Sequence, residues 1–150
     1  PGFNQWLNQR LTDEPFKLLQ SEQSDMLMSA TNMDSPSLAL KYLLGQDKWY
    51  KDPIISNILR EPLLSLCTHY ILLEKRAEGT AADSVAHFHL NNGARVEKLN
   101  WLADLSVRGL HQSNGIMLNY LYDLRTIDAN HESYRAGEPI ITSAVVKNLL

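Results

Sequence analysis

"SVAHFHLNNGARVEKLNWLAD", residues 84–104, contains a change from helix to strand within one stretch of sequence. Asp83 precedes it and can cap a short helix to about Leu90, because an aspartate side chain accepts hydrogen bonds from the first amides of a helix. The Asn-Asn-Gly run at 91–93 then supplies a stop, since asparagine and glycine tolerate the backbone of a helix end. Residues 94–102 have the pattern of an extended segment. We therefore predict a helix followed directly by a strand.

Two histidines, His87 and His89, lie in this predicted helix, and three interpretations compete for them. In a strand they would point the same way and could hold a metal, but no motif such as HExxH supplies further ligands. In a helix, Val85, Phe88 and His89 share one face, so His89 would point inward. A core histidine bonded to a backbone carbonyl and a catalytic histidine both fit that position. The residue pattern leaves these two alternatives open.

A second extended segment is expected at residues 116–124, where side chains alternate with the period of a strand. The side chains predicted to share one face are Ile116, Leu118, Tyr120, Tyr122 and Leu124. A last helix is expected to begin near Thr142 or Ser143. Because two strands do not make a covered sheet alone, we expect their partner strands upstream of Pro1, in a half of the domain that this chain lacks.

The first half of the sequence has helical patterns only. Apolar residues recur at helical spacing in residues 3–11. The other segments predicted to be helical are 21–31, 35–45 and 52–76. Pro62 falls inside the last of these and should kink that helix or divide it in two, because proline cannot donate a backbone hydrogen bond.

Helices followed by a few strands among helices predict an α+β fold. We expect a helical segment at about residues 1–80 and a mixed segment at about residues 81–150. The 150 residues amount to about one domain. The chain begins with Pro-Gly-Phe rather than methionine and ends on an apolar pattern without a cap, so we expect a piece of a longer polypeptide.

Composition argues against several classes of function. A net charge of -3 disfavours nucleic-acid binding, which needs basic side chains to neutralise phosphates. No apolar run approaches the roughly 20 residues of a membrane span. The single cysteine, Cys67, excludes an internal disulfide, and its apolar neighbours predict a buried, unreactive thiol. Low cysteine content fits a reducing compartment, and we expect a cytoplasmic protein.

Three strings in the second half carry a family resemblance. They are "FHLNNGARVEKLNWLAD" (88–104), "SVRGL" (106–110) and "SNGIMLNYLYDL" (113–124). Together they closely resemble the C-terminal catalytic region of the malonyl-CoA decarboxylase family, whose hallmark there is Phe-His-Leu-x-Asn-Gly-Ala. The opening "PGFNQWL" is similar to the end of the family's Ser-Pro-Ile-Pro-Gly-Phe element, and the helices between resemble the family more loosely. The resemblance thus covers essentially the whole chain.

The resemblance implies decarboxylation of malonyl-CoA to acetyl-CoA and CO2 through an enolate, on a GNAT-like acyl-CoA-binding domain. It implies a Ser-His pair in which His89 is the catalytic histidine and the serine lies just upstream of Pro1. Tyr122 matches a residue lining the same site. Asn92 and Asn119 match motif positions, where we expect support of the site before contact with substrate. No metal or organic cofactor is implied, and the isolated chain is expected to be inactive.

Two other functions compete with this reading. A CoA-dependent acyltransferase would use a related fold to pass an acyl group to an amine. A non-enzymatic helical interaction module would use Tyr42, Trp49 and Tyr50 near a docking surface, although core packing is the simpler role for these rings. Homo-oligomerisation of the full-length protein is left open, and Tyr122 could instead be a core tyrosine on the face of Ile116.

Overall fold

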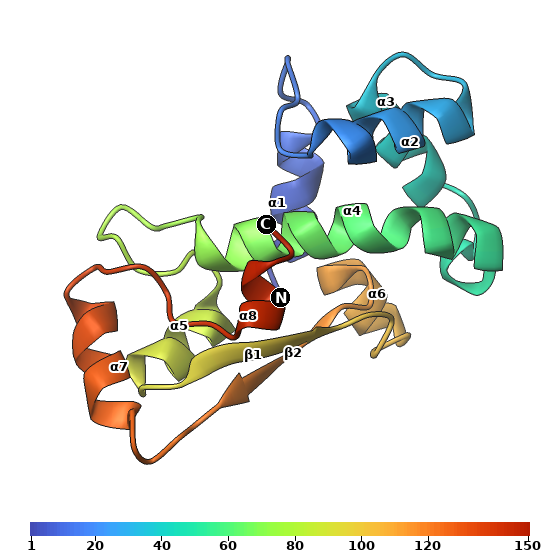
Figure 1. The fold of residues 1–150 in the computed structure, drawn as a ribbon. Helices are drawn as coiled ribbons and strands as arrows, with labels where there is room; N and C mark the ends of the chain where they lie inside the picture. The colour runs from blue at the N-terminus through green and yellow to red at the C-terminus, as the bar shows by residue number, and fades with distance from the viewer.

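Helix α4, Pro53–Leu72, is the longest element and runs through the middle of the molecule (Figure 1). The structure is a computed structural model that describes all 150 residues. The side chain of Asp52 accepts hydrogen bonds from the amides of Ile54 and Ile55 at 2.9 and 3.2 Å, so the cap that begins α4 satisfies its first donors. Pro62 lies inside this one continuous helix, so a division into two helices is wrong.

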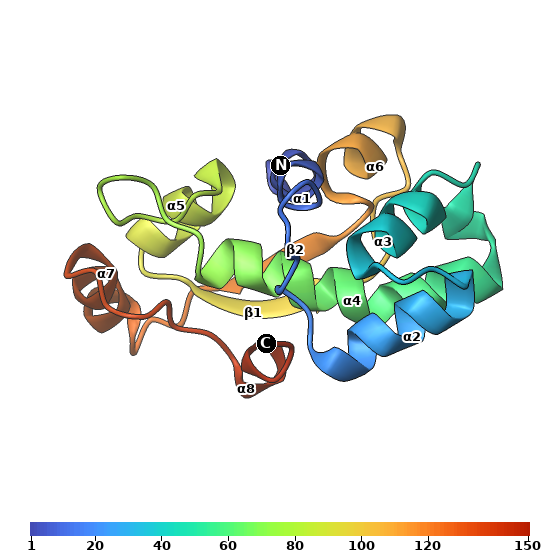
Figure 2. The same cartoon turned by 90° about the horizontal axis from the view of Figure 1, so that it is seen from above.

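Short helices pack around α4 in the first half of the chain. They are α1 (Phe3–Arg10), α2 (Ser21–Thr31), α3 (Pro36–Leu44) and the 3-10 turn η1 (Trp49–Lys51). Both views place α2 and α3 together beside the N-terminal half of α4, with α1 next to α6 (Figures 1 and 2). The predicted helical first half is confirmed.

The second half alternates helices and strands. Its elements are α5 (Ser84–Asn91), β1 (Arg95–Asn100), α6 (Val107–Ser113), β2 (Met117–Leu121), α7 (Ile127–Arg135) and α8 (Ala144–Lys147). Helix α5 and strand β1 confirm the predicted change of structure within residues 84–104. The second strand ends at Leu121, earlier than expected, and α7 was not predicted. The α+β class is confirmed.

The sheet consists of two antiparallel strands beneath α4 (Figure 2). Arg95 pairs with Leu121 and Val96 with Tyr120, and the register is irregular between Val96 and Lys98. On its other side, β1 makes one parallel bridge, from Val96 to Thr142 just before α8. β2 therefore pairs with β1 alone, and the pairing sets the position of Tyr120 opposite a fully buried valine.

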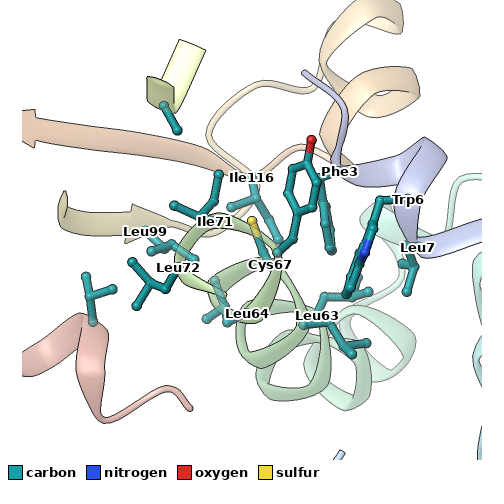
Figure 3. Packing of buried hydrophobic residues seen from close by; sticks show 14 of the residues in the cluster. Phe3, Trp6, Leu7, Leu63, Leu64, Cys67, Ile71, Leu72, Leu99 and Ile116 are labelled. Carbon is teal, nitrogen blue, oxygen red and sulfur yellow. The ribbon is translucent and has the colours of Figure 1, made fainter. Parts of the chain in front are cut away.

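The core lies where α1, α4 and the strands meet (Figure 3). Figure 3 shows side chains of α1 and α4 converging with Ile116, the residue that precedes β2. Cys67 of α4 is buried among them, and burial together with the negative charge of Asp83 raises the pKa of its thiol to about 12. This agrees with the unreactive thiol expected from the sequence. No helix combines the length and apolar composition that a membrane span requires.

Candidate active site

Asp83 fixes the start of α5, the helix that carries His89. Its Oδ1 atom accepts hydrogen bonds from the amides of Val85 and Ala86, both at 3.0 Å, which confirms the predicted cap. Its Oδ2 atom accepts from the Gly2 amide at 3.3 Å and from the Tyr70 hydroxyl at 3.4 Å. Burial opposes the charge of Asp83, but the hydrogen bonds from the amides of Ala86 and Gly2 lower its pKa below the ordinary value. One buried carboxylate thus joins α5 to α4 and to the start of α1.

Helix α5 buries a different face from the one predicted. Ala86 and Leu90 are buried, since α5 packs on α7 and β1 along that side. Val85 and Phe88 are 44% and 61% exposed, so the expectation that His89 points into the core beside them is wrong. His89 is only partly covered, and its ring is accessible for chemistry.

Two tyrosines from β2 and its end hold the ring of His89. The Nδ1 atom of His89 lies 2.7 Å from the hydroxyl oxygen of Tyr122, a hydrogen-bonding distance. The ring of Tyr120 stacks on the imidazole, with centroids 4.3 Å apart and planes 18° apart. The Nε2 atom makes no hydrogen bond within the chain. When Tyr122 donates to Nδ1, Nε2 carries the proton of the neutral ring and is free to donate it.

Tyr122 therefore contacts His89. Its side chain is 41% exposed, so the alternative of a core tyrosine on the face of Ile116 is wrong. β2 ends at Leu121, so Tyr122 follows the strand and leaves the sheet before its ring could enter the core. The sequence pattern carried no sign of this early end.

Neither Asn92 nor Asn119 makes a hydrogen bond to His89. The side-chain amide of Asn92 donates to the carbonyl of Phe88 at 2.7 Å and so closes the end of α5. The side chain of Asn119 accepts a hydrogen bond from Asn100 across the two strands. Both side chains serve the scaffold in this structure, the role expected first for them.

A cavity of about 390 Å³ has Tyr120 in its lining but neither His89 nor Tyr122. Its walls come from α4, α6, β2 and the first residues of the chain, and Tyr70, Asp83, Arg108 and Tyr120 supply polar groups. Pro1 lines the same cavity. Tyr120 both lines this space and touches His89. The sequence analysis placed it on a strand face and within a string that resembles the family, but gave it no role in the site.

The second histidine of the motif has a different environment. The Nδ1 atom of His87 lies 2.8 Å from the hydroxyl oxygen of Tyr134 in α7. That oxygen also accepts a hydrogen bond from the amide of Ala81 at 2.9 Å, so the Tyr134 proton is directed to His87. His87 thus anchors α7. No three His, Cys, Asp or Glu side chains group to form a metal site.

Comparisons with known proteins agree on one family. The family model described as malonyl-CoA decarboxylase C-terminal domain matches residues 1–150. The mitochondrial malonyl-CoA decarboxylase of Anser anser anser is 36% identical to this chain, and the alignment covers 97% of this chain and 30% of the Anser protein. The Mus musculus protein of the same name is 34% identical, over 100% of this chain and 31% of its own length.

Solved structures give the same result at the level of the fold. The crystal structure of malonyl-CoA decarboxylase from Rhodopseudomonas palustris superposes with a TM-score of 0.81 at 35% identity, over 99% of this chain and 31% of that one. The structure of malonyl-CoA decarboxylase from Agrobacterium vitis superposes with a TM-score of 0.81 at 33% identity, over 99% of this chain and 33% of that one. The chain spans about a third of the length of these relatives. This chain belongs to the malonyl-CoA decarboxylase family, and it corresponds to the family's C-terminal domain.

Proposed function

We propose that this chain is the C-terminal part of an enzyme that decarboxylates malonyl-CoA to acetyl-CoA and CO2, with His89 as a catalytic residue. The observation that carries the proposal is the ring of His89, fixed by two tyrosines with its Nε2 atom unpaired, next to a tyrosine-lined cavity. Relatives named malonyl-CoA decarboxylase over the whole chain supply the substrate class.

The chemistry explains why a free imidazole N–H is useful. In the malonyl thioester, the bond between the carboxylate carbon and the α-carbon breaks and CO2 leaves. The electron pair forms an enolate, whose charge develops on the thioester oxygen. Donors fixed near that oxygen stabilise the transition state, and an acid then protonates the α-carbon. The Nε2–H group of His89 holds the malonyl group by a hydrogen bond and orients the hydroxyl of the upstream serine of the pair.

The serine of the proposed pair lies outside this chain. Pro1, the residue nearest to that serine in the sequence, lines the same cavity as Tyr120, and Tyr120 touches the imidazole of His89. A residue shortly before Pro1 can therefore approach this space. The GNAT-like character of the whole domain and the cytoplasmic location stay predictions.

A product assay separates decarboxylation from the acyltransferase alternative. We expect the full-length protein to convert malonyl-CoA to equal amounts of acetyl-CoA and CO2 with no acceptor amine present, because loss of CO2 needs only a proton donor. Labelled CO2 release and chromatography of the CoA products measure this. Acyl transfer that requires an amine, with no CO2 released, would contradict the proposal.

Tyr122→Phe tests the hydrogen bond to His89. We expect kcat to fall by about two- to tenfold, since one neutral hydrogen bond contributes roughly 0.5–1.5 kcal/mol and the ring stays in place. Steady-state kinetics on malonyl-CoA measure the effect. Tyr42→Phe is the matched control, because Tyr42 is a half-exposed residue of α3 away from His89. Equal kcat for Tyr122→Phe and the wild type would remove this bond from the mechanism.

The interaction-module alternative has less support. Trp49 is 6% exposed and packs against the rings of Tyr50 and Trp101, so it belongs to the core. Of the three aromatic residues considered for docking, Tyr42 alone is half exposed. One exposed ring does not make a docking surface of the usual size.

A further inference from the structure

We propose that Tyr120 is a positioning residue whose ring sets the tilt of the His89 imidazole. The inference rests on the proposed function, because it assigns a role relative to His89. The two rings lie face to face, with centroids 4.3 Å apart and planes 18° apart. Offset or parallel contact of this kind is favourable for aromatic rings and leaves little freedom for the ring plane to tilt.

The two tyrosines restrain different motions of the imidazole. The hydrogen bond between the Tyr122 hydroxyl and Nδ1 selects which edge of the imidazole faces the end of β2. It does not by itself prevent the ring from rocking about that bond. The Tyr120 face blocks this rocking, so the direction of the Nε2 atom is determined only when both contacts are present. Preorganisation of this kind is what catalysis by a positioned proton donor requires.

Tyr120 is itself held firmly. It lies within β2, opposite Val96, which is completely buried. Its ring also forms part of the cavity wall next to Tyr70 and Asp83. Phe88, a further ring near His89, meets it edge-on with the centroids 5.2 Å apart and is 61% exposed, so it offers no comparable platform. The rigid contact is the one with Tyr120.

The ring rather than the hydroxyl carries this role. The Tyr120 hydroxyl makes no hydrogen bond within the chain, and burial together with the charge of Asp83 raises its pKa, so it stays neutral at ordinary pH. The neutral phenol presents a flat ring with an electron-rich face, and the imidazole stacks on that face. Phenylalanine would preserve both properties.

The test compares Tyr120→Phe with Tyr120→Leu in the full-length protein. We expect Tyr120→Phe to keep kcat within about threefold, and Tyr120→Leu to lower it about ten- to hundredfold with KM little changed, because a small misplacement of a catalytic group has effects of that size. Leu121→Ala, one position along β2 on the opposite face, is the control for a general disturbance of the strand. It should retain near-normal kcat. Tyr120→Met replaces Tyr120→Leu if the leucine variant does not fold.

An NMR signal distinguishes positioning from simple packing. In protein with 13C-labelled histidine, the His89 resonance is identified by its loss in His89→Ala. The stacked tyrosine shields the imidazole protons, so their signals should move downfield in Tyr120→Leu and stay in place in Tyr120→Phe. Unchanged kcat and shifts in Tyr120→Leu, or equal losses in both variants, would overturn the proposal. If His89→Ala retained activity, the proposed function would fail instead, while the shifts would still report the stack.

Discussion

Turnover of malonyl-CoA by the full-length protein is expected to fall about 10²- to 10⁴-fold in His89→Ala, the range seen when a positioned proton-transfer group is removed. Turnover by His89→Asn should fall by a similar factor, because the asparagine amide is too short to reach the position of Nε2. The loss should appear in kcat more than in KM, since the Nε2 atom acts on charge that develops after binding. Steady-state kinetics on purified full-length protein measure both constants.

His111→Ala is the matched control for that experiment. His111 is an exposed histidine of α6 whose side chain lies outside the cavity wall. It should keep normal turnover. Circular dichroism should show both variants folded, because His89 is partly exposed and its removal leaves no large void. Activity of His89→Ala within a few-fold of the wild type would remove His89 from the mechanism.

Gly93→Ala should destabilise the packing of α5 on α7 by about 2–5 kcal/mol, the sum of backbone strain and overpacking. Gly93 has a φ of +87°, which side chains rarely adopt. An added Cβ would overlap the backbone carbonyl oxygen of Ile127, at the start of α7, and lie 3.0 Å from its carbonyl carbon. The overlap can be relieved only if α7 moves away from Gly93. The hydrogen bond from the Asn130 side chain to the Gly93 carbonyl, at 3.1 Å, opposes this movement.

Hydrogen exchange of α5 and α7 peptides in the full-length protein measures this local loss of stability. Gly79→Ala separates its two causes. Gly79 has nearly the same backbone, with a φ of +86°, but nothing lies within 4 Å of an added Cβ. It should show only the smaller strain, of about 1–2 kcal/mol. Equal effects of the two substitutions would mean that the contact with Ile127 relaxes at little cost.

Local signals of sequence predicted most of the architecture. Asp52 and Asp83 cap the helices that their positions indicated, because capping depends on a few neighbouring residues. The face of α5 that is buried could not be predicted from such local signals. Its eight residues carry apolar side chains on more than one side, and packing on α7 and β1 selects Ala86 and Leu90. α7 escaped prediction because its sequence is mostly polar and long-range bonds from His87 and Asn130 hold it.

In the candidate site, too, the sequence indicated some of the residues, whereas tertiary structure alone determines one of the contacts. The family resemblance pointed to His89 and Tyr122, and the structure brings them into contact. Tyr120 lies in a string that resembles the family, but neither the resemblance nor strand alternation gave it a role, since its contact with His89 joins residues far apart in the chain and depends on where β2 lies. Side-chain stacking of this kind is determined by tertiary structure.

The double attachment of Asp83 has a consequence for substitutions at the start of the chain. The same buried carboxylate binds the amide of Gly2 and the first turn of the helix that bears His89. A side chain at Gly2 would collide with the hydroxyl of Tyr70, the third partner of that carboxylate. A substitution at Gly2 is therefore expected to disturb the contacts of Asp83 and, through them, the start of the helix that bears His89, although Gly2 is remote from the imidazole in the chain.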